Sequence, residues 1–99
     1  MATTTGNNSY TLVKEVSITI GDLTGLSSKT VTATVDAFLN PTMVPVVTST
    51  GLSDYGIGIS HAWFSNPSYA GTTLNIKLYN LALATAVASD PVTFKMVVL

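Results

Sequence analysis

The chain contains no cysteine and no arginine among its 99 residues. The lack of cysteine excludes disulfides, cysteine-based zinc sites and thiol catalysis, and it leaves the redox compartment undetermined. The positively charged residues are four lysines spread from Lys14 to Lys95. Nucleic-acid binding requires lysine and arginine clustered on one surface, because the phosphates must be neutralised together. We therefore expect no nucleic-acid partner.

Charge of either sign is scarce. Asp, Glu, Lys and Arg make up 9% of the chain, and the formal net charge is −1. An average soluble domain carries roughly 25% of such residues, and interspersed charge normally keeps copies of a protein apart. Two interpretations follow: hydroxyls and amides keep the protein soluble, or much of its surface is covered in an assembly. We favour the second.

The first nine residues are mostly Thr, Asn, Gly and Ser, without a positive or an apolar stretch. They predict a flexible N-terminal arm over residues 1–9 and no signal peptide. No apolar run approaches the roughly 20 residues of a membrane span, so we expect no membrane partner and synthesis in a cytoplasm. The remaining residues, 10–99, have room for one domain.

Apolar residues alternate with polar ones over residues 16–20, 30–35, 74–79 and 93–98. A period of two predicts half-buried strands. Pro45 cannot donate a hydrogen bond to a neighbouring strand, which places the segment around it at a sheet edge or a strand start. Leu81–Ala88 is apolar all round and short, and we interpret it as a loop or a single turn.

Turn residues separate these segments at short intervals. They occur at Gly21-Asp22, Gly25 to Ser28, Asn40-Pro41, Gly51 to Gly56, Asn66-Pro67 with Gly71, and Asp90-Pro91. About seven short strands with frequent turns predict an all-β protein, a single-domain antiparallel β-sandwich that is jelly-roll-like.

Residues capable of catalysis are few. His61 is the only histidine and has the same parity as Ile57, Ile59 and Trp63, which favours a hydrogen-bonded core or interface position over a general base or metal ligand. Most of the acidic residues border turns, where a carboxylate caps the backbone. The acidic residues are Glu15, Asp22, Asp36, Asp54 and Asp90, and four of these five border turns. We expect no enzyme activity, no catalytic or metal-binding residues and no cofactor.

Aromatic side chains offer the alternative of a sugar-stacking surface. The candidates are Tyr55, Trp63, Phe64, Tyr69 and Tyr79. Trp63 and Phe64 are neighbours in a predicted strand, so they should point to opposite faces. Packing in a core or interface is the favoured role for each. A glycan-binding module would instead use an exposed aromatic in a turn, Tyr69 or Tyr55.

The order of elements over residues 29–99 resembles that of the small β-sandwich virion proteins of tailed bacteriophages, in particular head decoration (cement) proteins and some fibre domains. The shared features are an A-W-x-S strand around Trp63, an L-x-I-x-L-x-N strand that ends at Asn80, and an ending that starts at Asp90-Pro91. These three residues serve as structural markers, and no catalytic residue is transferred.

The resemblance implies an oligomer, often a homotrimer, that sits on the capsid surface of a virion and binds the major capsid protein. The leading hypothesis is therefore a decoration protein that stabilises an assembled phage head. The alternative is a phage fibre or lectin-like module that binds a host glycan.

Overall fold

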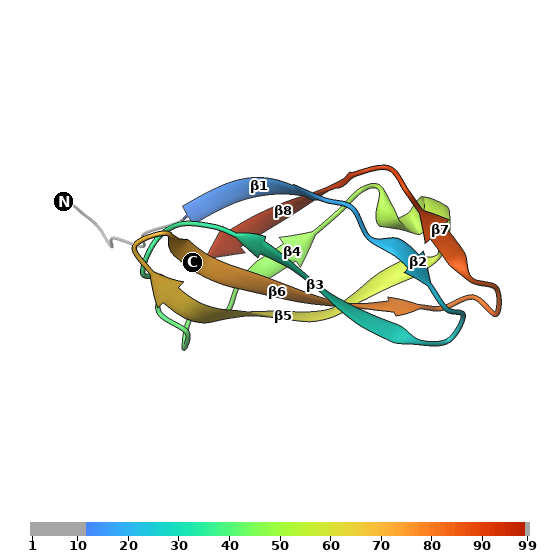
Figure 1. The fold of residues 1–99 in the computed structure, drawn as a ribbon, viewed down its shortest axis with the longest axis horizontal. Coiled ribbons are helices and arrows are strands. Elements are labelled where there is room, and N and C mark those ends of the chain that lie inside the picture. The colour runs from blue at the N-terminus through green and yellow to red at the C-terminus, as the bar shows by residue number, and fades with distance from the viewer. Residues whose placement is uncertain (1–11, 99) are drawn as a thin grey trace, which may run out of the picture.

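The structure, a computed structural model of the chain, describes residues 12–98. These residues form eight strands, one short 3₁₀ turn and no α-helix, which confirms the all-β prediction. The strands are β1 (Leu12–Ile18), β2 (Gly21–Leu23), β3 (Ser28–Thr34), β4 (Val46–Thr48), β5 (Ile57–Ser68), β6 (Gly71–Asn80), β7 (Ala86–Ala88) and β8 (Val92–Val98), and the 3₁₀ turn η1 spans Leu52–Tyr55 (Figure 1). The arm predicted over residues 1–9 and the predicted start of the domain at Tyr10 lie outside the described residues.

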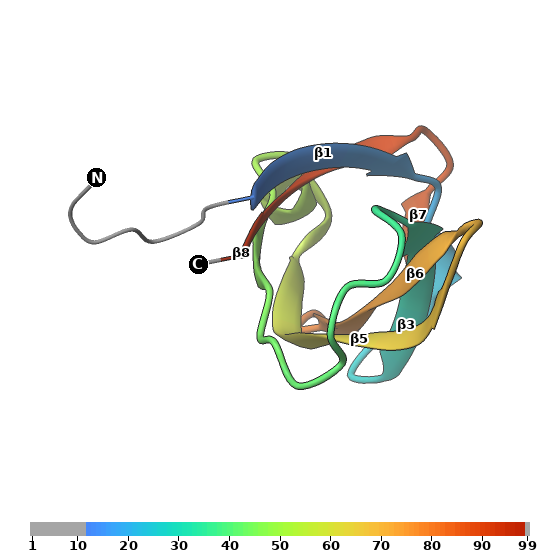
Figure 2. The ribbon, with the colours of Figure 1, turned by 90° about the vertical axis from the view of Figure 1, so that its left-hand side faces the viewer.

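The strands form three antiparallel sheets, with orders β1-β8-β4, β2-β7 and β3-β6-β5. Only a few residues join β1 to β2 and β7 to β8, so the two-stranded sheet extends the β1-β8 pair along the molecule. β1 and β8 lie on one side of the molecule, and β3, β5 and β6 lie on the other (Figure 2). One hydrophobic cluster draws residues from all three sheets.

The two central strands, β6 and β8, supply the most deeply buried side chains. Leu74, Ile76 and Leu78 of β6 are fully buried, and Phe94 and Met96 of β8 are fully buried as well. Strands β6 and β8 are each the middle strand of a three-stranded sheet. Burial of each of these side chains contributes about 1.5–3 kcal/mol. The alternation predicted for these two segments is confirmed.

Three local predictions are corrected. Gly21-Asp22 is part of strand β2 rather than a turn, and Gly21 at φ 74° makes the bend out of β1. Asn66-Pro67 lies inside β5, where an irregular register between Ser65 and Ser68 absorbs it, and the turn falls at Tyr69-Ala70. The apolar segment Leu81–Ala88 ends in the short strand β7, because its pairing with β2 buries two of its alanines.

Pro45 directly precedes β4, a three-residue strand at the edge of the β1-β8-β4 sheet. Its prediction as an edge or strand-start residue is therefore confirmed. The turns predicted at Gly25 to Ser28 and at Gly51 to Gly56 also form, the second as the 3₁₀ turn η1.

Asn80, at the end of β6, is the largest polar side chain that is fully buried among the described residues. Its Nδ2 donates to the backbone oxygens of Leu23 and Ala84, each at 2.9 Å. Its Oδ1 accepts a hydrogen bond from the backbone N–H of Ala82, also at 2.9 Å. The amide therefore joins β2 to the loop that follows β6, and no polar atom of the side chain is left without a partner.

We predict that Asn80→Ala lowers the free energy of unfolding by about 2–4 kcal/mol, because it leaves buried backbone groups without partners. The measurement is urea denaturation followed by circular dichroism. Asn75→Ala is the matched control, since Asn75 lies on the same strand and also makes two side-chain hydrogen bonds, but is only partly buried. A loss for Asn80→Ala no greater than that for Asn75→Ala would contradict the prediction.

Candidate functional site

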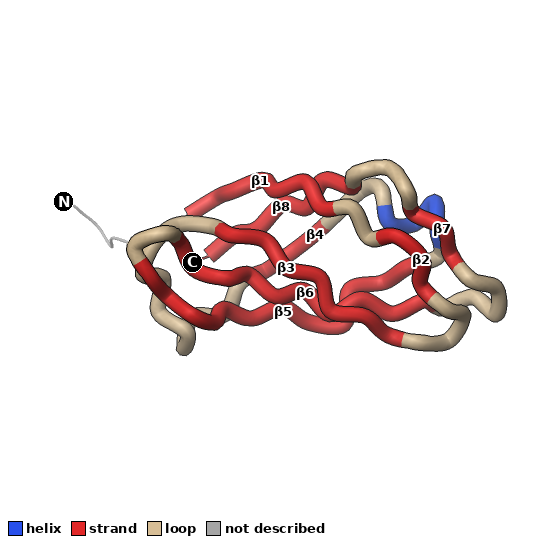
Figure 3. Tube along the Cα trace, viewed as in Figure 1, coloured by secondary structure: helices blue, strands red, loops and turns tan. Residues whose placement is uncertain are grey.

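Loops gather at the two ends of the molecule, and the 3₁₀ turn lies at the end that carries β2 and β7 (Figure 3). Four large apolar side chains are exposed on the loops and strand at that end. They are Leu26, Leu81, Leu83 and Val87, which we call the apolar tip, with exposed fractions of 53%, 68%, 86% and 61%. Exposed apolar patches of this kind mark interaction sites more often than scattered single residues do.

The apolar tip is held rigidly by contacts between its two loops. The backbone N–H of Leu26 donates to the carbonyl oxygen of Ala82 at 3.0 Å. A Cβ on Gly25 would lie 2.0 Å from the carbonyl oxygen of Leu83, so only glycine allows this approach. Leu26 itself has φ 54°, a left-handed conformation that costs a non-glycine residue about 1–2 kcal/mol. Such a residue persists where its surroundings fix it, and it is a common mark of functional sites.

A shallow hollow adjoins the apolar tip and is lined by Ser53, Gly56, Ile57, Leu81 and Ala82. The backbone N–H of Leu81 donates to the carbonyl oxygen of Gly56 at 3.0 Å, which joins two of the residues that line the hollow. The lining is largely apolar and carries no ionisable side chain. It extends the apolar tip toward η1.

A second apolar surface crosses the outer face of the β1-β8-β4 sheet. Val13, Val97 and Val46 are cross-strand neighbours on the three strands, and Val13 and Val46 are each 53% exposed. The next row of the same face places Glu15 opposite Lys95. This face therefore combines an apolar row with a row that holds one charge of each sign.

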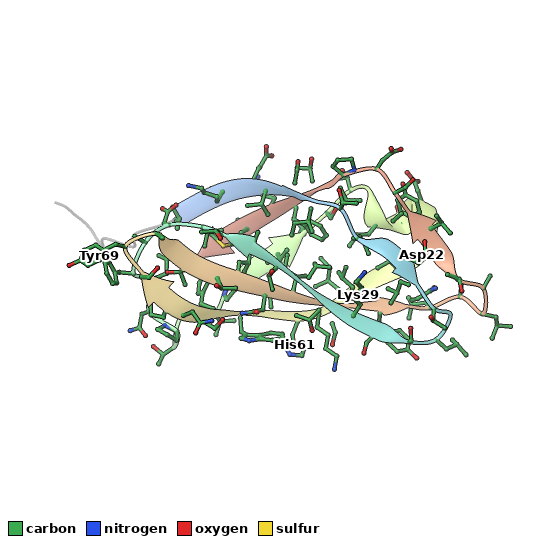
Figure 4. All side chains as sticks on the ribbon, viewed as in Figure 1. Asp22, Lys29, His61 and Tyr69 are labelled. Atoms are coloured by element: carbon green, nitrogen blue, oxygen red, sulfur yellow. The ribbon has the colours of Figure 1, made fainter. Side chains whose placement is uncertain are left out.

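The far end of the molecule carries an exposed aromatic pair. The rings of Phe38 and Tyr69 meet edge to face with centroids 4.6 Å apart. Tyr69 is 92% exposed in the turn between β5 and β6 (Figure 4), so it is not packed in the core and has the exposure that the alternative of a glycan-binding module requires. Tyr55, the other turn aromatic considered from the sequence, instead packs against the hydrophobic core. Of the two, Tyr69 is the more exposed, and Tyr55 is only partly exposed.

The sequence favours a core or an interface position for His61, and the structure excludes the core position. The register of β5 against β6 shifts between Ile59 and His61, because Ser60 is an extra residue in the strand. The shift reverses the alternation: Ile57 is buried, whereas His61 is exposed on the outer side of β5 (Figure 4). Its Nδ1 lies 3.2 Å from the hydroxyl of Ser60.

Trp63 and Phe64 point to opposite faces of β5, as predicted. Phe64 is buried in the core at 3% exposure, while Trp63 is partly exposed beside His61. The rings of His61 and Trp63 stack, with centroids 4.9 Å apart and planes 26° apart. Tyr79 of β6 is 37% exposed on the same face.

The acidic residues are dispersed. Asp36 pairs with the Nζ of Lys14 at 2.6 Å, which links β1 to the segment after β3. Asp22 lies in β2, Asp54 in η1 and Asp90 in the bend before β8. Within residues 12–98 no group of three or more His, Cys, Asp or Glu side chains is arranged to hold a metal ion. No helix in this part of the chain has the length and apolar character needed to cross a membrane.

Comparison with known proteins gives no relative for this chain. No protein-family model matches it, and no curated protein or solved structure matches it. Its functional interpretation therefore depends on the residues and surfaces described above.

We predict that Gly25→Ala separates the two loops of the apolar tip, because its Cβ would meet a backbone oxygen rather than a flexible side chain. The expected result is a stability loss of about 1–3 kcal/mol and faster proteolytic cleavage within residues 81–85. Gly58→Ala is the control, since its Cβ would lie 3.7 Å from the end of the Leu81 side chain, an ordinary contact. Equal cleavage rates for Gly25→Ala and wild type would refute this account.

Proposed function

We propose that this chain is a structural virion protein of a tailed phage, a decoration protein that binds the major capsid protein and stabilises the assembled head. It acts on the capsid surface as an oligomer, a homotrimer, and performs no enzymatic reaction. In this proposal the β1-β8-β4 and β2-β7 sheets form one layer of a jelly-roll-like sandwich and the β3-β6-β5 sheet forms the other, and the apolar tip is the part that contacts the capsid.

The apolar tip is the observation that carries this proposal. Its leucines are exposed, yet the loops that bear them are fixed by Gly25, by the Leu26 N–H and by Asn80. A rigid apolar surface loses little conformational entropy when a partner covers it. Burial of one exposed leucine side chain contributes about 1.5–3 kcal/mol, so a few such side chains can provide a stable contact.

The scarcity of charge supports the same proposal. Charged residues are depleted at the centres of protein interfaces, and only 9% of this chain is charged. The row of Val13, Val97 and Val46 offers a second apolar surface, away from the apolar tip, for contact between copies. Closed cyclic symmetry is the usual way in which copies of one chain assemble, which is compatible with a trimer.

The proposal that the partner is a phage head rests on the resemblance of residues 29–99 to phage virion proteins. Of its three markers, Asn80 is the buried residue that fixes the loop behind the apolar tip. Trp63 lies on the outer side of β5, and Asp90 lies in the exposed bend before β8. One of the three residues that mark the resemblance, Asn80, therefore also holds the loop of the proposed contact surface in place.

We predict that Leu81→Ser combined with Leu83→Ser weakens binding to phage heads at least tenfold while stability changes by less than about 0.5 kcal/mol, because both side chains are exposed. Binding is measured by cosedimentation with purified heads of the phage that encodes the chain, after the resident protein has been removed. The control is Val44→Ser, an equally conspicuous apolar residue at 75% exposure in the loop before β4. Undiminished binding by the double variant would show that the apolar tip is not part of the contact with the head.

The copy number of the chain in purified virions separates decoration from the alternative of a fibre or lectin-like module. Quantitative mass spectrometry should give hundreds of copies for a decoration protein, and a few to some tens for a fibre. Light scattering of the purified protein should give the mass of a trimer. The finding that the protein is strictly monomeric and does not bind phage heads would overturn the proposed function.

A further inference from the structure

The outer face of the β3-β6-β5 sheet differs in composition from the rest of the surface. The strand registers align its side chains in rows that run across all three strands. One row contains Thr30, Lys77 and His61, and the next contains Thr32, Asn75 and Trp63. A third row contains Thr34, Thr73 and Ser65. Hydroxyl and amide groups therefore surround one stacked aromatic pair.

The aromatic pair is not needed for the core. Trp63 does not belong to the hydrophobic cluster, although Ala62 and Phe64 on either side of it do pack there. The extra residue Ser60 in β5 turns His61 and Trp63 outward together, so that their rings stack on the surface. A bulge that re-aims side chains in this way is common next to binding sites. The indole is consequently fixed in orientation and still partly open to solvent.

The polar groups beside Trp63 are also held in place. The Nδ2 of Asn75 donates to the backbone oxygen of Trp63 at 3.2 Å and to the hydroxyl of Ser65 at 2.9 Å. These two bonds orient the amide and leave its acceptor oxygen for a ligand. The Thr32 hydroxyl lies in the same row, and the Thr30 hydroxyl lies in the next.

The charge on this face has one sign. Lys77 is the cross-strand neighbour of His61, and both are outward residues. No Asp or Glu occurs among the outward residues of the three strands, from Ser28 to Thr34, Ile57 to Ser68 and Gly71 to Asn80. The opposite sheet, in contrast, places Glu15 across from Lys95. An anionic ligand is therefore favoured on the β3-β6-β5 face over the β1-β8-β4 face.

We propose that this face binds a saccharide that carries a carboxylate. The apolar side of a sugar ring packs on the indole of Trp63, which offers a large, rigid surface. The sugar hydroxyls exchange hydrogen bonds with Thr32 and Asn75, and the carboxylate pairs with the ammonium of Lys77. This site is separate from the apolar tip, so it goes beyond the proposed head-binding function and would let a virion-bound copy hold a surface glycan.

The test is a glycan array of sialylated and uronic-acid oligosaccharides, each printed beside its neutral counterpart, followed by calorimetric titration of the best binder. Wild-type protein should bind acidic members at least tenfold more tightly than neutral ones. Trp63→Ala should lose binding to both at least tenfold. Lys77→Gln should lose only the preference for acidic members, a change that a purely structural role would not produce.

Tyr69→Ala is the matched control, because Tyr69 is the most exposed aromatic residue described and lies in the turn beyond this face. It should bind saccharide as wild type does, and thermal melting of each variant checks that it is folded. No wild-type binding to any acidic member, or full binding by folded Trp63→Ala, would overturn the proposal. The Leu81→Ser, Leu83→Ser variant should keep saccharide binding, which separates failure of this site from failure of the head-binding proposal.

Discussion

The side-chain amide of Asn80 joins parts of the molecule that are far apart in the sequence. It bonds to Leu23 in β2 and to Ala82 and Ala84 in the loop after β6. That loop has no strand pairing until β7 begins at Ala86. Because a buried amide stabilises only when its donors and acceptor are all matched, the position of the loop is strongly specified. The exposed leucines of the apolar tip depend on this anchoring.

The outer surfaces of the protein have three different chemistries. The end that carries β2 and β7 exposes four large apolar side chains together with Asp22 and Asp54. The β1-β8-β4 face combines a valine row with one pair of opposite charges, and the β3-β6-β5 face is polar with one lysine. A chain with so little charge has few means of preventing association. In the proposals made above, one of these surfaces contacts a capsid, another contacts a copy of the chain, and the third binds a saccharide.

Backbone irregularities decide what each surface presents. Leu26 and Phe38 adopt left-handed conformations at opposite ends of the molecule, and both have exposed apolar side chains. The extra residue at Ser60 brings His61 and Trp63 to the surface. A second irregularity absorbs Asn66-Pro67 into β5 and moves the turn to Tyr69, the most exposed aromatic residue described. Each of these irregularities interrupts regular strand pairing or restricts the backbone, and each exposes a large side chain.

The sequence alone determined the all-β class, the strands β6 and β8, the edge position of Pro45 and the opposite orientation of Trp63 and Phe64. These follow from a period of two and from the missing N–H of proline, which are local properties. The sequence could not place His61, since a bulge depends on the partner strand and reverses every later residue. It also gave no sign that Leu81–Ala88 ends in a strand, because β7 exists only through its pairing with β2. The apolar tip was likewise decided by tertiary structure, through the contact of Gly25 with Leu83 and the anchoring by Asn80.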